Sequence, residues 1–272
     1  MTWQSETIVA NGLRLHYTRT GGDKPVLVMA HGFSDDGLCW TPVARLLEAR
    51  YDVIMLDARG HGRSEAPDGG YGTAEHVADI AGLISVLHLQ RPIVLGHSMG
   101  AMTALLLAGT HPGLPRAILL EDPPPTWSHN WPPPSSAQRG GRRHWIVDVK
   151  RKTREEMIAD QRAASPSWSE DELGPWADSK LRLSMYVLRT EDQAAVDWHA
   201  AVRSVTCPTL LITAERERGA IVSSEDATKL QAILPQMRVA HIAGAGHSIR
   251  REQFAEYMRV VREFLGEIGN TE

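Results

Sequence analysis

Short apolar runs recur along this chain with helix-length segments between them, and this alternation constrains the fold more than any other feature. Continuous apolar runs of strand length indicate burial on both faces, as in a parallel sheet. The runs are residues 25–30, 53–56, 93–95, 117–120 and 209–213, with 239–243 as a further candidate. Helical segments at 73–87, 98–111 and 252–265 alternate with them. This order predicts an α/β fold with a mostly parallel, doubly wound sheet.

The beginning of the chain has a different pattern. Residues 7–9 and 13–17 are strand-like and flank Asn11-Gly12, a pair typical of a type I′ turn. We therefore expect a β-hairpin ahead of the parallel strands.

Residues 123–204 interrupt the alternation, because they contain no convincing buried strand. The segment opens with a triple proline, has a candidate hinge at Gly140-Gly141, and carries capping-box patterns that begin at Thr153 and Ser169. We predict a helical cap over 123–204, inserted into a core made of residues 1–122 and 205–272.

The bulk composition is that of an ordinary globular protein and excludes several classes of function. Hydrophobic residues make up 42%, charged residues 23%, and the net charge is −4, so a nucleic-acid partner is not expected. No apolar run is long enough to span a membrane, no signal peptide is visible, and the 2 cysteines require no disulfide framework. No metal-ligand spacing, P-loop or dinucleotide motif occurs. We expect a cytoplasmic enzyme that needs no metal or cofactor and whose partner is a small-molecule substrate.

The strongest chemical motif is Gly96-His97-Ser98-Met99-Gly100, which lies between a predicted strand and a predicted helix. In this G-x-S-x-G arrangement a sharp turn exposes the serine hydroxyl at the start of the helix, and flanking glycines prevent steric collisions. Ser98 is therefore the predicted nucleophile. The N–H of Met99 and that of Phe33, in His31-Gly32-Phe33 after the first long strand, are predicted to bind an oxyanion.

The order of these motifs resembles the α/β-hydrolase family. The resemblance rests on His31-Gly32, the loop 57–64, the Ser98 pentapeptide and a late Gly246-His247. It covers the whole chain apart from residues 123–204, which resemble that family's cap domain. For the loop 57–64 we expect a structural role, so His61 is not expected to be catalytic. The resemblance implies that His247, among 12 histidines, is the base that activates Ser98.

The acid that orients His247 is ambiguous in the sequence. The family's commonest arrangement places an aspartate shortly after strand 209–213, whereas this chain has Glu217 there. Some members, such as haloalkane dehalogenases and fungal zearalenone lactonases, take a glutamate from the strand that follows the nucleophile helix, and Glu121 matches that position. Glu121 is expected to be the more buried, which favours it as the acid. Glu217 remains the alternative and Asp122 a weaker third choice.

Tryptophans and basic residues gather in the insertion. Trp127 and Trp131 are candidates for the wall of an apolar or aromatic substrate site. The basic stretch from Arg139 to Arg154 is interleaved with acids just downstream and is expected to be a solvated face.

The leading hypothesis is a serine hydrolase that cleaves a carboxylic ester or lactone through an acyl-enzyme. Carbon–carbon or amide hydrolysis by the same triad is the enzymatic alternative. A ligand receptor on a hydrolase scaffold is the alternative from another class of function.

Overall fold

The fold is built on one eight-stranded sheet, in a computed structural model that describes residues 2–128, 135–189 and 195–269. The strand order is β1-β2-β4-β3-β5-β6-β7-β8, and the neighbours from β4 to β8 are parallel. The strands are β1 Gln4–Ala10, β2 Leu13–Arg19, β3 Val26–Ala30, β4 Asp52–Leu56, β5 Ile93–His97, β6 Ala117–Glu121, β7 Thr209–Thr213 and β8 Met237–His241. The predicted parallel sheet is confirmed, although β8 lies two residues earlier than its apolar run.

The N-terminal hairpin is also confirmed. Strands β1 and β2 are antiparallel, with Ala10 opposite Leu13. Asn11 and Gly12 both have positive φ, 49° and 74°, as a type I′ turn requires.

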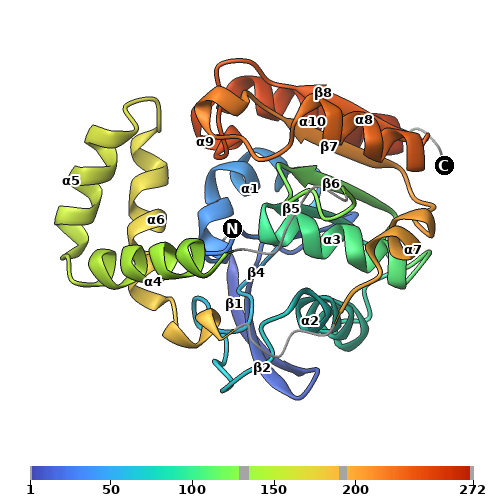
Figure 1. Cartoon of the computed structure of the whole chain (residues 1–272). Coiled ribbons are helices and arrows are strands. Elements are labelled where there is room, and N and C mark those ends of the chain that lie inside the picture. The colour runs from blue at the N-terminus through green and yellow to red at the C-terminus, as the bar shows by residue number, and fades with distance from the viewer. Residues whose placement is uncertain (1, 129–134, 190–194, 270–272) are drawn as a thin grey trace.

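Helices cover both faces of the sheet (Figure 1). They are α1 Thr41–Leu47, α2 Thr73–Val86, α3 Met99–Thr110, α8 Ser224–Ile233, α9 Ile249–Glu252 and α10 Phe254–Gly269. Side chains alternate along β5, so Val94 packs under α2 and α3, while Ile93 and Leu95 join the core beneath α1 and α10. This burial on both faces explains why the strand sequences are continuously apolar.

The segment between β6 and β7 is helical in its described part. Its elements are α4 Ser136–Lys150, α5 Arg154–Ala164, α6 Glu170–Arg182, the 3₁₀ turn η2 Met185–Leu188 and α7 Trp198–Arg203. In Figure 1, α4, α5 and α6 stand beside the sheet, while α7 packs on α3. The cap boundaries at 123 and 204 stay a prediction.

Local signals within the insertion had mixed outcomes. The capping box at Thr153 is confirmed, since its hydroxyl accepts from the N–H of Glu156 and the Glu156 carboxylate accepts in return. Ser169 begins α6 without a side-chain cap, because Glu172 is instead bound to Arg251. The hinge predicted at Gly140-Gly141 is wrong, because both glycines lie inside α4.

Within residues 2–128, 135–189 and 195–269, no helix combines the length and apolar character that a bilayer crossing requires.

Candidate active site

Ser98 lies at a strained turn between β5 and α3. Its backbone has φ 50° and ψ −112°, a conformation that a non-glycine residue adopts only when its surroundings enforce it. The flanking glycines are sterically required: a Cβ on Gly96 would lie 2.3 Å from the carbonyl of Gly100, and one on Gly100 would lie 2.2 Å from the carbonyl oxygen of Ala30. The turn therefore lifts the Ser98 side chain to a partly exposed position.

The surroundings of Ser98 come from neighbouring strands. Its N–H donates to the carbonyl of Glu121 at the end of β6, at 2.9 Å. On the other side, Gly32 follows β3, and a Cβ there would lie 3.6 Å from Ser98 Cβ. The serine thus lies where the carboxyl ends of three parallel strands meet, the usual place for a site in an open α/β sheet.

Two backbone N–H groups are available beside Ser98. In the described part of the chain, neither the Phe33 N–H nor the Met99 N–H takes part in a hydrogen bond, and the first N–H groups of a helix lack intrahelical acceptors. The Phe33 carbonyl is held by His61 Nε2 at 2.6 Å, while His61 Nδ1 lies 2.8 Å from the carbonyl of Arg59. His61 therefore braces the loop that carries Phe33.

His247 meets an aspartate. Its Nδ1 lies 2.7 Å from Asp122 Oδ2, and its side chain is 34% exposed while that of Asp122 is 0% exposed. Asp122 also accepts from the N–H groups of Ile221 and Val222 at 2.8 and 2.9 Å. Three donors thus fix the carboxylate, and the carboxylate fixes the imidazole.

The residue beside the serine holds the backbone of the histidine loop. His97 Nε2 donates to the carbonyl of His247 at 3.0 Å, and the two rings lie 4.7 Å apart. Burial lowers the pKa of His97 well below its ordinary value, so its ring stays neutral. The nucleophile turn and the histidine loop are therefore linked directly.

Neither of the two glutamates predicted to orient His247 contacts its ring. Glu121 is fully buried, as expected, but its Oε1 accepts from the Arg250 N–H at 3.0 Å and its Oε2 meets the Arg250 guanidinium at 3.2 Å. Glu217 is exposed in the 3₁₀ turn η3 Arg216–Arg218. The predicted contact of His247 with Glu121 or Glu217 is therefore wrong, and Asp122, the third choice, makes it.

Burial alone misled the choice of acid, because Glu121 and Asp122 are both buried. Successive side chains of a strand point to opposite faces, and Asp122 in addition has φ 42°, where the chain leaves β6. The sequence signal that could have found it is position: Asp122 follows the strand end, where loop residues turn over the sheet edge.

A buried network of charges adjoins the site. Asp35 accepts from Lys180 on α6 at 2.9 Å and from Arg250 and Arg251 on α9 at 3.2 and 3.1 Å. Although burial acts in the opposite direction, Arg251, Lys180 and Arg250 hold the pKa of Asp35 well below its ordinary value. This network connects the loop after Phe33, the helix after His247 and the insertion.

The tryptophans do not form the expected wall in the described part of the chain. Trp127 is 1% exposed, packs into the core on the α3 side of the sheet, and donates from Nε1 to the carbonyl of Asp226 at 2.9 Å. Trp127 is thus a core side chain and not part of an exposed wall, and its role in substrate binding stays a prediction. Trp131 lies outside the described residues.

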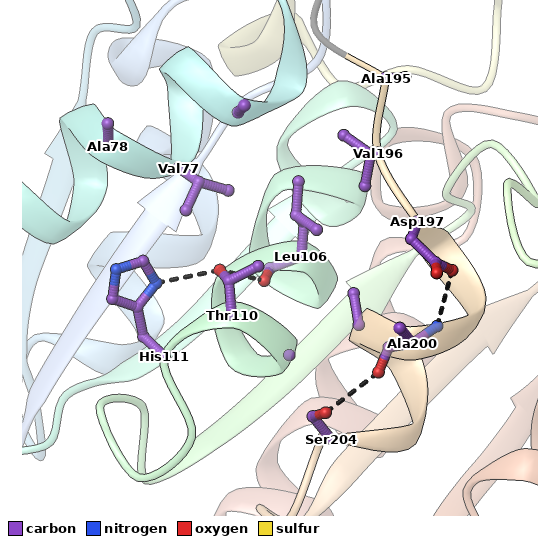
Figure 2. A pocket seen from close by; sticks show the side chains of 13 residues that line it. Val77, Ala78, Leu106, Thr110, His111, Ala195, Val196, Asp197, Ala200 and Ser204 are labelled. Atoms are coloured by element: carbon purple, nitrogen blue, oxygen red, sulfur yellow. Dashed lines mark hydrogen bonds between the residues drawn. The ribbon is translucent and has the colours of Figure 1, made fainter.

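A cavity of about 580 Å³ lies between α2, α3 and α7, away from Ser98 and His247. Figure 2 shows Val77, Leu106 and Val196 around it. Thr110 and His111, which share a hydrogen bond, also line it. Its described lining contains none of the residues that surround Ser98. Among the described residues, no cluster of His, Cys, Asp or Glu is placed to hold a metal ion.

Comparisons with known proteins agree with this architecture. The chain is 32% identical over 264 residues to N-formylmaleamate deformylase of Pseudomonas putida, covering 95% of each chain. It is 26% identical over 257 residues to 2-(acetamidomethylene)succinate hydrolase of Mesorhizobium japonicum, covering 91% of this chain and 90% of that one.

Two solved structures share the fold. E-2-(acetamidomethylene)succinate hydrolase has a TM-score of 0.80 at 22% identity, covering 97% of this chain and 100% of that one. The enol-lactonase of Burkholderia xenovorans has a TM-score of 0.75 at 24% identity, covering 96% and 100%. The family model for the alpha/beta hydrolase fold matches residues 25–250. The predicted fold is thus confirmed, and the chain belongs to the α/β-hydrolase family.

Proposed function

We propose that this hydrolase cleaves an acyl bond through a covalent intermediate on Ser98, with His247 as general base and Asp122 as the acid that orients it. The observation that carries the proposal is the 2.7 Å contact between His247 Nδ1 and Asp122, in the loop that His97 attaches to the Ser98 turn. Because Nδ1 is engaged, Nε2 is the nitrogen that takes the serine proton.

The proposed reaction has two halves. Ser98 Oγ attacks the substrate carbonyl carbon while His247 Nε2 removes its proton, and the N–H groups of Phe33 and Met99 stabilise the negative oxygen. The imidazolium then protonates the leaving group, and the bond from carbonyl carbon to leaving group breaks. Water, deprotonated by His247, attacks the acyl carbon. The bond from that carbon to Ser98 Oγ then breaks, the acid leaves, and His247 returns the proton to Ser98.

An amide is the favoured substrate type. Two relatives that match over nine-tenths or more of this chain are named for compounds with formyl or acetamido groups, and those groups are N-acyl groups. Ester or lactone hydrolysis is the second candidate, because the same attack on a carbonyl with an oxygen leaving group needs no additional residue. A receptor role is disfavoured by the complete set of Ser98, His247 and Asp122.

The test is Ser98→Ala against the matched variant Ser204→Ala, whose exposed hydroxyl lies at the end of α7. Both are assayed on short N-formyl and N-acetyl amides and on 4-nitrophenyl esters. Ser98→Ala is expected to abolish turnover with an unchanged melting temperature, and Ser204→Ala to keep it. Mass spectrometry of the native enzyme with a slowly deacylated ester should find the acyl group on Ser98. Turnover by Ser98→Ala, or an acyl group elsewhere, contradicts the proposal.

A further inference from the structure

Arg142, on α4, lies directly over the loop that adjoins the nucleophile. Its guanidinium carbon is 4.5 Å from the centroid of the Phe33 ring. Phe33 is the residue after Gly32, which packs against Ser98. A cation is thus placed over the side chain of the residue whose backbone N–H is proposed to hold the oxyanion.

Packing fixes this position. Ile146, one helical turn after Arg142, is 1% exposed and belongs to a small apolar cluster with Tyr71, Leu183 and Val187, against which Phe33 packs. Phe33 itself is held through its carbonyl by His61. The Phe33 side chain and the backbone of α4 at Arg142 are therefore both held by packing.

Arg142 differs from most other basic side chains of the insertion, which have partners of their own. Lys150 donates to three backbone carbonyls at the end of α6. Carboxylates pair with the following side chains: Arg151 with Asp148, Lys152 with Asp160, Arg154 with Asp178, Arg162 with Glu170, Lys180 with Asp35, and Arg182 with Asp36. The solvated face expected from Arg139 to Arg154 describes Arg151, Lys152 and Arg154, whose charges are paired. Arg142 is exposed as well, but its guanidinium lies on an aromatic ring.

No carboxylate lies within ion-pair distance of Arg142 among the residues that the structure describes. Arg142 is an exposed residue, although the atoms packed around its guanidinium lower the pKa of that group. A partly desolvated cation without a counter-charge gains more from an arriving anion than a fully hydrated cation does. With one face on the Phe33 ring, the edge of the guanidinium is left for two parallel N–H donors.

We propose that Arg142 forms a carboxylate-binding subsite, so that the substrate is an amide or ester carrying a carboxylate a few bonds from its scissile carbonyl. The subsite rests on the proposed function, because it places the carbonyl between Ser98 and the N–H of Phe33. The carboxylate accepts two hydrogen bonds from Arg142 and thereby sets the orientation of the acyl group.

The experiment uses two substrates that differ in one charge, 4-nitrophenyl hydrogen succinate and its methyl ester. Arg142→Met is expected to reduce kcat/KM on the acid by about 10- to 100-fold, the size of a charge-assisted bidentate bond, and to leave the neutral ester nearly unchanged. Arg142→Lys should retain only part of the selectivity, since an ammonium group lacks the planar fork. Arg143→Met, at the exposed neighbouring position, is the matched control and should behave as the native enzyme.

A binding measurement separates this subsite from the catalytic proposal. Succinate should bind to Ser98→Ala, as calorimetry would measure, and the affinity should fall about tenfold or more in Ser98→Ala/Arg142→Met. Three results would each overturn the subsite. They are an equal loss of kcat/KM on the acid and on the neutral ester in Arg142→Met, an equal effect of Arg143→Met, and an affinity for succinate that Arg142→Met leaves unchanged. Turnover by Ser98→Ala together with Arg142-dependent succinate binding would instead reject the nucleophile and keep the subsite.

Discussion

At the scale of single residues, Glu121 and Asp122 are adjacent and equally buried, yet they serve different parts of the site. Asp122 contacts His247 Nδ1, whereas Glu121 is bonded to Arg250. In Asp122→Asn, an amide nitrogen facing Nδ1 would favour the wrong imidazole tautomer, so kcat should fall on the order of 10³- to 10⁴-fold with little change in KM. Steady-state kinetics on a 4-nitrophenyl ester measures this, with the melting temperature confirming the fold.

Glu121→Gln is the matched variant for the neighbouring carboxylate. It leaves the fully buried Arg250 without one of its two carboxylate partners, so the free energy of unfolding should drop by about 3 kcal/mol. Activity per folded molecule should change less than tenfold, because His247 keeps its partner. Urea unfolding and kinetics on the same samples check both effects. If Glu121→Gln instead lost the activity while Asp122→Asn lost mainly stability, Glu121 would be the acid that orients His247.

This pair also marks how far the sequence determines a site. Ser98 is predictable from local steric rules, because its strained turn needs Gly96 and Gly100 within the same pentapeptide. The choice between Glu121 and Asp122 depends on Arg250 and His247, which are more than a hundred residues away. Burial can be read from apolar neighbours, but the direction of a carboxylate at a strand end depends on which partners the rest of the fold brings there.

At the scale of elements, the buried charges connect α6 of the insertion to the core. Lys180 donates to Asp35 and to the carbonyl of Ser34, and Arg251 meets Glu172 of the same helix at 3.0 Å. Lys180→Met removes one cation from this buried network and should lower the free energy of unfolding by about 3 kcal/mol. Thermal and urea unfolding measure it.

The exposed pair of Arg162 and Glu170, at 2.6 Å, supplies the control for this prediction. Arg162→Met should leave the free energy of unfolding nearly unchanged, because solvent screens that pair. The double variant Lys180→Met/Asp35→Asn should lose less free energy of unfolding than the two single variants together, since it leaves no buried carboxylate without its cation. Additive losses would show that Lys180 and Asp35 do not stabilise each other.

Elements differ in how well their sequences predicted them, for a physical reason. The strands of the sheet were found because burial on both faces leaves a continuous apolar run, and the Thr153 cap was found because its partners are three residues apart. The Ser169 pattern failed because Glu172 is drawn to Arg251. The hinge predicted at Gly140-Gly141 failed because Ile146 and Val149 bury one side of α4 against its neighbours. This packing outweighs the low helix propensity of two glycines.

At the scale of the whole molecule, buried histidines make the fold sensitive to acid. Burial lowers the pKa of His61 to about 4 and holds those of His76 and His97 well below the ordinary value. In the unfolded chain these rings bind protons near pH 6.5. The unfolded state therefore binds more protons than the folded state between pH 6.5 and about 4, so stability should fall as the pH is lowered through that window.

Carboxylates determine how stability changes with pH at the acid end of the range. Asp35 and Asp57, whose partners hold their pKa values low in spite of burial, contribute stability that is lost only below about pH 4. Burial raises the pKa values of Asp36 and Glu121, and these two oppose the loss, because they take up protons more readily when folded. The decline between pH 6.5 and 4 can therefore be assigned to the histidines.

His61→Gln tests that assignment, because it removes one titrating ring from the loop that carries Phe33. The interval from 6.5 to about 4 corresponds to about 3 kcal/mol. Between pH 7 and pH 4, the free energy of unfolding measured in urea should therefore fall less in His61→Gln than in the native chain, with a difference of up to that amount. His144→Gln, at an exposed position on α4, should leave the native difference unchanged. If His61→Gln loses as much stability as the native chain between these pH values, His61 is already protonated in the folded state. Its two carbonyl contacts, to Arg59 and Phe33, would then outweigh its burial.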